Sequence, residues 1–311
     1  MTLRHLKIFV TVADCNSITG AANKLYLAQP AVSLAIRELE QHYGVRLFER
    51  LSHRISITPD GRRMYAYASH ILDTMGQLEK DMHNPDGLGL LRVGCSITIG
   101  TRLLPSLVSR YRAENPGMQL EAQIFSSEHI EQLLLQGRID LGLIEGRCTS
   151  DELESHSFMR DRLAVVCAPN NGFAEQKIIT PLQLFSSPLL LRERGSGTRE
   201  LLEAAAVVRG YILRPLWEST STQALIAGVA EGHGLSVLPY LLVKQLLDSG
   251  HLCELTVEGM TLERELLLLR HKNKFVTPGM KAFADEVNRI FLCECQTSSK
   301  TAPISSCKNA D

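Results

Sequence analysis

Long apolar runs are absent from the sequence, and so are the segments that would direct it to a membrane or out of the cell. No run in its 311 residues approaches the roughly 18 apolar residues of a transmembrane helix. The apolar stretch at the N-terminus soon reaches Asp14 and Asn16 and has no small-residue cleavage site, so it predicts a helix and not a secretion signal. We therefore expect a cytoplasmic protein without membrane contact.

Paired cysteines and the common catalytic motifs are also missing. The eight cysteines are scattered, and Cys293-x-Cys295 lacks a second pair or a nearby histidine, so we expect reduced thiols and no metal site or cofactor. The chain has no H-E-x-x-H, G-x-S-x-G, Walker A or post-strand G-x-G-x-x-G motif. The GSGT segment at 195–198 has no base within sequence reach, so a serine nucleophile is not expected. The sequence therefore predicts a protein that is not an enzyme.

Net charge is nearly absent, but it is unevenly distributed. The chain has 33 basic and 34 acidic residues, for a net charge of −1. Residues 1–65 hold nine Lys or Arg against five Asp or Glu, so this segment is +4 and the remainder is −5. A basic head on an acidic body indicates that a polyanion binds at one end only.

The basic head has the pattern of a helix-turn-helix. Ser17 stands where an N-cap belongs, before a short helix, and the next helix opens with the sequence QPAVS and ends before Gly44. Its exposed positions are predicted to be Gln29, Ser33 and Arg37, side chains that can hydrogen-bond to base edges or phosphates in a DNA groove.

Two short strands, 48–50 and 55–57, are predicted to follow as a wing whose turn contains basic side chains that reach phosphates or the minor groove. The alternative is a solvated basic surface on an ordinary helical domain, which the +4 charge and the adjoining wing disfavour. The candidate DNA-binding residues are Gln29, Pro30, Ser33, Arg37, Arg50, His53 and Arg54.

A long amphipathic helix is predicted next, with Thr58 as its cap and Pro59 in its first turn. Apolar residues recur along it at alternating gaps of four and three, as in a coiled-coil seam: Met64, Ala68, Ile71, Met75, Leu78 and Met82. The helix is too long for the small head to cover, so we expect it to pair two copies into a homodimer, the alternative being that it packs only on its own head. Residues 84–89 are expected to be a hinge.

From residue 90 onward, short apolar strands alternate with helices, and the alternation restarts near residue 161. This pattern predicts α/β structure with mostly parallel sheets in two lobes. We assign the head to 1–58, the linker helix to 59–83, lobe I to 90–160 plus 266–292, lobe II to 161–265, and an expected disordered tail to 293–311.

Hydroxyl residues fall at the strand ends of both lobes, where open α/β sheets bind ligands and helix N-termini attract anions. Each could simply be an N-cap, but several facing one cleft favour a small-anion site. The candidate effector contacts are Ser96, Thr98, Ser196, Gly197, Thr198 and Thr220. Arg194 or Arg199 are candidate charge partners, and Glu145 is either a contact for a ligand donor or a solvated loop acid.

The first sixty residues resemble the DNA-binding domain of LysR-type transcriptional regulators. The positions shared with that family are Phe9, Ser17, Ala21, Ala22, Leu25, Gln29, Pro30, Ser33, Leu39, Glu40, Gly44, Leu47, Phe48, Arg50, Thr58 and Gly61. Two residues depart from the pattern: Gly20 lies mid-helix, and Leu34 replaces a commonly polar residue on the recognition helix.

The body resembles the effector domain of the same family, which is similar to periplasmic solute-binding proteins. The stretches that carry this likeness are LLRVGCSITIGTRLLP, GRIDLGLIEG, RERGSGTRELLE and VAEGHGLSVLP. The resemblance implies a winged helix-turn-helix with a long linker helix, followed by a two-lobed α/β effector domain. It also implies binding to an interrupted inverted repeat in double-stranded DNA, control by a small-molecule effector, and assembly into homodimers and tetramers, with RNA polymerase as a further candidate partner.

Two other functions are alternatives to transcriptional regulation. A transport-type binding protein would explain two lobes, but not the basic head, and it would need an export signal. A redox sensor could use Cys95, Cys148 or Cys167, but a peroxide-sensing member of the family would carry two cysteines within 193–210, where this sequence has none.

Overall fold

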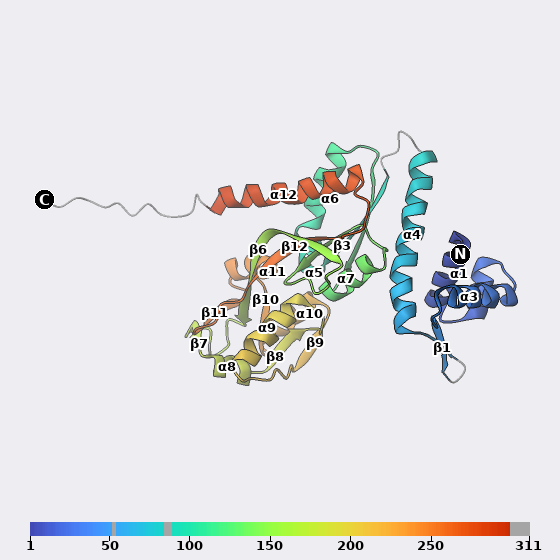
Figure 1. The fold of residues 1–311 in the computed structure, drawn as a ribbon. Helices are drawn as coiled ribbons and strands as arrows, with labels where there is room; N and C mark the ends of the chain where they lie inside the picture. Colours follow the sequence, from blue (N-terminus) through green and yellow to red (C-terminus); the bar gives the residue numbers. More distant parts are fainter. Residues whose placement is uncertain (52–53, 84–88, 299–311) are drawn as a thin grey trace.

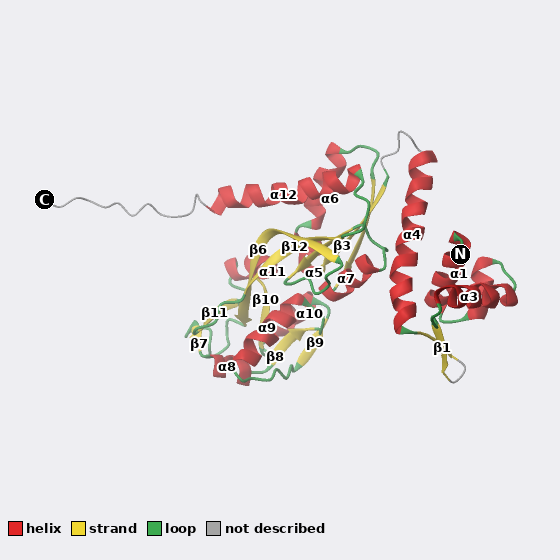
Figure 2. Ribbon diagram, in the orientation of Figure 1, coloured by secondary structure: helices red, strands yellow, loops and turns green. Residues whose placement is uncertain are grey.

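A computed structural model of the chain describes residues 1–51, 54–83 and 89–298. A small helical head and a larger α/β body lie on opposite sides of one long helix, α4 (Pro59–His83) (Figure 1). Strands are concentrated in the body, and the head carries one hairpin (Figure 2). No helix in the described part of the chain is both long and apolar enough to cross a membrane.

The head contains the three helices that the sequence predicts: α1 (Leu3–Cys15), α2 (Ile18–Leu25) and α3 (Gln29–Tyr43). Ser17 caps α2 by accepting a hydrogen bond from the Gly20 N–H at 3.0 Å, and Gly44 ends α3 in the left-handed region at φ 68°. Apolar side chains from all three helices, including Phe9, form the core of the head. This core fixes α3 with its opposite face toward solvent.

The wing is the antiparallel hairpin of β1 (Phe48–Leu51) and β2 (Arg54–Ile57), in which Phe48 pairs with Ile57. Each strand is one residue longer than predicted. The buried end of the hairpin is tied to α3, because the Glu40 carboxylate accepts hydrogen bonds from the backbone N–H groups of Leu47 at 2.8 Å and Phe48 at 3.3 Å.

The start of α4 is joined to the same end of the wing. The Thr58 hydroxyl donates to the Arg46 carbonyl at 2.6 Å and accepts from the Gly61 N–H at 2.9 Å, which makes it the predicted cap. A Cβ at Gly61 would lie 2.2 Å from the Leu47 carbonyl oxygen, so only glycine allows this close approach. Further along α4, Ala68 is buried in the core of the head, and the Tyr65 hydroxyl donates to Asp14 on α1 at 2.5 Å.

The first lobe of the body combines a parallel sheet with covering helices. Its elements are β3 (Leu90–Ser96), α5 (Ile97–Arg102), α6 (Leu104–Glu114), β4 (Gln119–Phe125), α7 (Ser127–Leu135), β5 (Leu141–Glu145) and the final helix α12 (Pro278–Ser298). β3 pairs in parallel with both β4 and β5. The carboxyl ends of these strands therefore meet at one edge of the lobe.

The second lobe repeats this design. Its elements are β7 (Ile178–Ile179), α8 (Pro181–Ser186), β8 (Leu189–Arg192), α9 (Gly197–Val208), β9 (Trp217–Ser219), α10 (Thr222–Ala230), β10 (Leu235–Pro239), α11 (Tyr240–Asp248) and β11 (Cys253–Val257). β8 pairs in parallel with β9 and β10.

Two long strands join the lobes into one sheet. These are β6 (Leu153–Cys167) and β12 (Glu263–His271), which are antiparallel to each other and to their neighbours on both sides. The strand order is β4-β3-β5-β12-β6-β10-β8-β9, so the sheet is mixed and not mostly parallel across its centre. β6 also runs through the boundary predicted at residues 160 and 161, because the polar first half of this strand gives no apolar strand signal.

Three further differences from the sequence prediction have local causes. The helical segment after β3 is not one helix but is broken at Leu103 into α5 and α6, because Pro105 lacks the N–H that would continue the helical hydrogen bonds. The short elements β7, α8 and β11 carry too little periodic signal to be predicted. The final helix continues to Ser298 and does not end near Leu292, since no proline or glycine interrupts that segment. The rest of the predicted tail lies outside the described residues.

Candidate functional site

The predicted DNA-reading side chains lie on the solvent face of α3. Gln29, Pro30 and Arg37 are exposed and Ser33 is half-buried. The Gln29 side-chain amide donates to the Ser33 hydroxyl at 2.9 Å, and the Arg37 Nε donates to the Ser33 carbonyl at 3.4 Å. Because α-helical residues four apart lie on one face, these three residues form a single polar strip along the helix.

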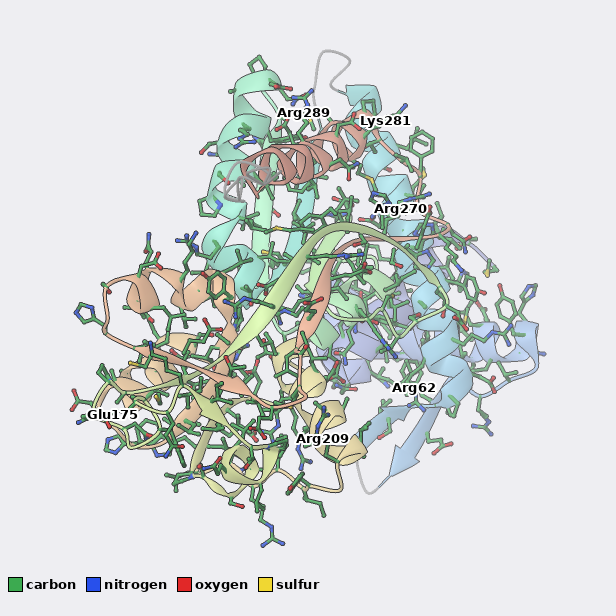
Figure 3. The ribbon with its side chains drawn as sticks, turned by 90° about the vertical axis from the view of Figure 1, so that its left-hand side faces the viewer. Arg62, Glu175, Arg209, Arg270, Lys281 and Arg289 are labelled. Atoms are coloured by element: carbon green, nitrogen blue, oxygen red, sulfur yellow. The ribbon has the colours of Figure 1, made fainter. Side chains whose placement is uncertain are left out.

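The side chains of the predicted wing residues Arg50, His53 and Arg54 lie outside the described part of the structure. The neighbouring Arg62 is described. It is exposed in the first turn of α4, next to the wing, and donates to the Ile57 carbonyl at 3.1 Å (Figure 3). Tyr26, which the sequence pattern did not single out, has a side chain that is 96 % exposed in the turn between α2 and α3.

At the junction of the two lobes, predicted effector residues gather around the carboxylate of Glu145. The Ser96 and Thr98 hydroxyls both donate to it, the latter at 2.7 Å. Arg264 on β12 forms an ion pair with it at 3.2 Å and donates to the hydroxyl of Thr198, from the second lobe, at 2.9 Å. Hydrogen-bond donors from both lobes, of the kind that bind anionic ligands, therefore converge on one carboxylate. That carboxylate is the side chain of Glu145 and not a bound ligand.

Asp161 on β6 completes this cluster. Its carboxylate accepts two hydrogen bonds from Arg264, at 2.8 and 3.0 Å, and all three charged side chains are buried. Burial raises the pKa of Asp161, although the charge of Arg264 opposes this shift. Glu145 is only 2 % exposed, so its interpretation as a solvated loop acid is wrong.

The backbone of the GSGT loop at 195–198 approaches the same carboxylate-bearing residue. A Cβ at Gly197 would lie 2.4 Å from the Glu145 carbonyl oxygen, so the loop reaches this position only with glycine there. Ser196 is buried at the N-cap position of α9, but its side chain makes no capping hydrogen bond. The lobes are thus in direct backbone contact at this point.

Other strand-end hydroxyls act as ordinary caps or lie elsewhere. Ser126 and Ser221 accept hydrogen bonds from the third residues of α7 and α10, at 3.4 and 3.2 Å, and are N-caps. Thr220 is exposed, whereas Thr222 is buried and accepts from Arg192 at 3.3 Å.

Neither predicted charge partner lies among the contacts of Glu145 described above. Arg194 is exposed, and Arg199 is buried beside Glu203, to which its Nε donates at 2.6 Å. The arginine at the cluster is Arg264, which was not among the predicted site residues. Its sequence signal was a basic residue just before the apolar run LLLL of a strand. Its hydrogen-bond partners lie 66 to 166 residues away in the chain, so the local sequence does not reveal them.

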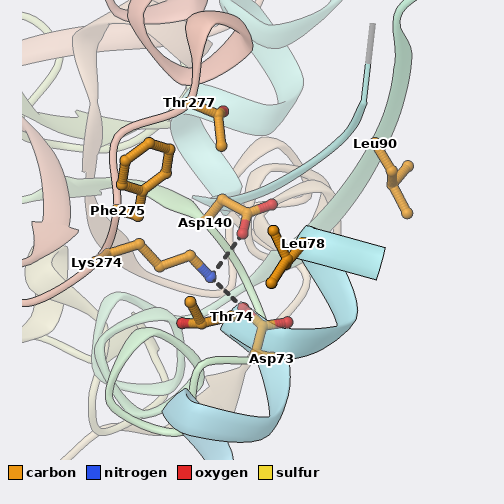
Figure 4. Close-up of a pocket in the computed structure, with 8 residues that line it drawn as sticks. All are labelled: Asp73, Thr74, Leu78, Leu90, Asp140, Lys274, Phe275 and Thr277. Carbon is orange, nitrogen blue, oxygen red and sulfur yellow. Dashed lines mark hydrogen bonds and ion pairs between the residues drawn. The ribbon is translucent and has the colours of Figure 1, made fainter. Parts of the chain in front are cut away.

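A second polar cluster holds α4 against the first lobe. Lys274 forms ion pairs with Asp73 of α4 at 2.5 Å and with Asp140 at 2.7 Å (Figure 4). Arg92 donates to both carboxylates. We call these four residues the clasp: Asp73, Arg92, Asp140 and Lys274. Burial opposes ionisation of Asp140, but Lys274 and Arg92 outweigh it and lower the pKa of this carboxyl.

A cavity of about 240 Å³ adjoins the clasp. Apolar side chains, including Leu78 and Phe275, line it together with Lys274 (Figure 4). Nearby, the His70 ring of α4 is stacked on His271 with centroids 5.4 Å apart, and its Nε2 is 2.9 Å from the Asn273 carbonyl oxygen. Leu78, predicted to lie in the dimer seam, thus also faces the body of its own chain.

The clasp and the Glu145 cluster lie at opposite ends of the same strands. β3 has Arg92 near its start and Ser96 at its end, and β5 runs from just after Asp140 to Glu145. β12, paired with β5, begins beside Arg264 and leads into the loop that carries Lys274. Three adjacent strands, β3, β5 and β12, therefore lead from the Glu145 cluster toward the clasp that holds α4.

The predicted seam of α4 is divided between three environments. Ala68 and Met64 pack on the head, and Ile71 and Met75 are exposed. Leu78 lines the cavity beside the clasp. A groove of about 460 Å³ runs beside Ile71, and its lining also includes Tyr43 and Tyr67. The Met82 side chain lies outside the described part of the structure.

Comparison with known proteins agrees with this architecture. Residues 3–62 match the family described as bacterial regulatory helix-turn-helix protein, lysR family, and residues 86–291 match the LysR substrate binding domain. The chain is 33 % identical over 285 residues to the uncharacterized HTH-type transcriptional regulator YeiE of Escherichia coli (strain K12), an alignment that covers 92 % of this chain and 96 % of YeiE.

Solved structures share the fold at lower sequence identity. A full-length OxyR variant from Pseudomonas aeruginosa aligns with a TM-score of 0.66 at 23 % identity, covering 92 % of this chain and 94 % of that one. Full-length CbnR, solved in complex with its target DNA, aligns with a TM-score of 0.61 at 21 % identity, covering 93 % and 99 %. With both family domains matched in order along its length, the chain belongs to the LysR family of DNA-binding transcriptional regulators with an effector-binding domain.

Proposed function

We propose that this regulator reads an interrupted inverted repeat in promoter DNA and responds to a small anion bound where its two lobes meet. Gln29, Ser33 and Arg37 read base edges, Pro30 fixes the first turn of α3, and the wing residues Arg50, His53 and Arg54 contact phosphates. In this proposal the head at 1–58 binds DNA, and the effector binds between the first lobe and lobe II at 161–265. We place the protein in the cytoplasm and infer that it is not an enzyme.

The observation that carries the effector proposal is the convergence of donors on the Glu145 carboxylate. Two hydroxyls from the first lobe, and Arg264 hydrogen-bonded to Thr198 of the second, surround an oxyanion that is nearly inaccessible to water. Such an arrangement suits a carboxylate or a similar oxyanion, because charge-assisted hydrogen bonds are strong in a dry site. We infer that a small anion competes with Glu145 for these donors.

Competition would change the contact between the lobes. An anion that takes the place of the Glu145 carboxylate leaves that side chain without its buried partners, so Glu145 must move. β5 ends at this residue and begins directly after Asp140 of the clasp, which gives the bound anion a route to α4. A ligand can control the head only through different affinities for two such arrangements.

Dimerisation through α4 is the second part of the proposal. The seam predicted from the sequence comprises Met64, Ala68, Ile71, Met75, Leu78 and Met82. Its exposed members Ile71, Met75 and Leu78 and the groove beside Ile71 support pairing, since exposed apolar side chains favour a partner. A second copy would bring two heads to the two halves of an inverted repeat. Assembly into a tetramer on DNA and contact with RNA polymerase belong to the same proposal.

The effector site is tested by thermal unfolding of the full-length protein with a panel of small anions and their neutral analogues. We expect one anion class to give a saturable rise in the melting temperature, about 2.7 kcal/mol of stabilisation at one hundred times its Kd. Thr98→Val should abolish the rise. Thr101→Val, on the same helix but exposed and bonded only within it, should retain the rise.

A second variant distinguishes the anion from a ligand that carries a donor group. Glu145→Gln removes the competing charge, so an anion should bind this variant at least as tightly as the wild type. A cationic or amine ligand held by Glu145 and Asp161 should instead bind it more weakly. Stabilisation by such a ligand and by no anion would overturn the anion proposal while leaving the DNA-binding function intact.

A further inference from the structure

Two cysteines face each other across the sheet of the second lobe. β11 runs antiparallel to β6, and Cys253 is paired directly with Cys167 in their register. Directly opposed residues of antiparallel strands have Cα atoms about 4.5 or 5.5 Å apart, depending on the hydrogen-bonding position. Both separations lie within the range of roughly 4.4–6.8 Å that a disulfide requires.

The two thiols also lie on the same face of the sheet. Side chains of directly opposed residues point to the same side, and both cysteines pack in the same apolar cluster, with Cys167 in its buried part and Cys253 at its margin. Both are free thiols in the structure. Neither strand needs to shift its register for the sulfur atoms to meet.

Accessibility differs between the two members of the pair. Cys167 is fully buried, whereas Cys253 is half-buried at the first residue of β11. On its other side β11 pairs with β7 only at Thr256 and Val257, so within the described residues no strand flanks the outer edge of Cys253. Burial and, to a smaller extent, the neighbouring Cys253 raise the pKa of Cys167 to about 11. Cys253 is therefore the thiol that a small oxidant reaches first.

We propose that Cys167 and Cys253 form a reversible intramolecular disulfide when the protein meets a hydroperoxide. The Cys253 thiolate attacks the peroxide, forming an S–O bond as the O–O bond breaks, and the departing oxygen leaves as water or an alcohol. The Cys167 sulfur then attacks the resulting sulfenic acid. The S–S bond forms, and the hydroxyl group leaves as water with the Cys167 proton. Two electrons pass from the cysteines to the peroxide.

The other three cysteines whose side chains the structure describes lack this arrangement. Cys15 lies on α1, Cys95 on β3 and Cys148 in the loop after β5, each on a different element from the pair. Burial and, to a smaller extent, Glu145 raise the pKa of Cys95 to about 12, which keeps it as an unreactive thiol near neutral pH. These cysteines therefore serve as internal controls.

The disulfide would join two strands that bracket the second lobe. The chain between Cys167 and Cys253 contains β7 to α11, so the crosslink closes a long loop around most of that lobe. Closure of a long loop restricts the unfolded chain. Oxidation should accordingly raise the temperature at which the protein unfolds, on the order of 5 °C or more.

The test uses the reduced full-length protein, treated with a slight excess of hydrogen peroxide, alkylated and analysed by intact mass and peptide mapping. We expect a loss equal to two hydrogen atoms, a crosslinked peptide containing Cys167 and Cys253, a higher melting temperature, and reversal of all three by dithiothreitol. Cys253→Ser and Cys167→Ser should each abolish the crosslink. Cys148→Ser, which removes another half-buried thiol, should leave it unchanged.

Three results would overturn the proposal. These are oxygen adducts on Cys253 without a crosslink, a disulfide that maps to other cysteines, and no reaction at peroxide concentrations that oxidise free cysteine. If Cys253→Ser does not fold, the Cys253→Ala variant and peptide mapping of the oxidised wild-type protein test the same disulfide.

Discussion

Gln29 and Arg37 lie about two turns apart on the exposed face of α3, and each of them contacts Ser33. This arrangement presents an amide and a guanidinium to the same groove. The amide can pair with adenine in two hydrogen bonds, whereas guanidinium favours guanine. We therefore propose that each of these two side chains contributes its own sequence preference, whereas contacts to phosphates contribute affinity.

Gln29→Ala should change the sequence preference of DNA binding, with a loss of about 1–3 kcal/mol on the preferred site and little loss on non-specific DNA. Binding would be measured on a panel of operators with single base changes at fixed salt. Gln41→Ala is the matched control, because Gln41 is an exposed glutamine at the other end of the same helix. Equal weakening on every sequence would count against base readout by Gln29.

Hydroxyl side chains show which residue roles the local sequence can predict. Ser126 and Ser221 cap helices, as their position before a helix predicts. Ser96 and Thr98 stand at an equivalent strand end but donate to Glu145. The sequence environment of the two groups is alike, so only the position of Glu145 on a neighbouring strand distinguishes them.

The helix α4 is the element on which the separate parts of the molecule meet. Its first turns pack on the head through Ala68, and Asp73 joins it to the body. Its apolar spacing was enough to predict the helix. Which of its seam residues the head covers could not be predicted, because that depends on how α1 and the wing approach α4 in space.

Ile71→Ser should weaken the dimer about 100-fold or more. Each copy would lose an apolar side chain worth about 1.5 kcal/mol or more on burial, and a symmetric dimer contains two copies. Sedimentation of the free protein over a range of concentrations gives the dissociation constant. Leu34→Ser is the control, since Leu34 is also an exposed apolar residue, 52 % against 42 % for Ile71, but lies on α3. An unchanged dimer in the Ile71 variant would contradict pairing through this part of α4.

Across the whole molecule, the clasp and the Glu145 cluster are connected by strands that both lobes share. β6 and β12 pair with each other over most of their length and leave no separate sheet for either lobe. Movement of one lobe against the other must therefore bend these two strands or act through their ends. The clasp lies at one such end, where it holds α4.

Asp140→Asn should lower the free energy of unfolding by about 1–3 kcal/mol at pH 7, because Lys274 and Arg92 lose one of the two carboxylates that they share. The folded-state pKa of Asp140 lies below its usual 3.8, so its contribution is complete above that value and is lost as the pH falls through the folded-state pKa. The difference between wild type and variant should therefore shrink in acid.

Urea unfolding at a series of pH values measures this difference. Glu154→Gln is the control, since Glu154 on β6 is an exposed ion-pair partner of Arg270 on β12. Its substitution should lower the free energy of unfolding by no more than about 1 kcal/mol. A difference for Asp140→Asn that stays constant down to pH 2 would show that its charge does not contribute to stability.

Local patterns in the chain were enough to predict the head, the wing, the long helix and the α/β alternation. Those features depend on caps, proline positions and apolar spacing, which act over a few residues. The folded sheet was needed to show that Arg264 meets Thr98, 166 positions away, and that Lys274 meets Asp73, 201 positions away. No local pattern selects such partners, because a charged side chain gains its partner from the packing of distant strands. The Glu145 cluster and the clasp are for that reason properties of the assembled sheet.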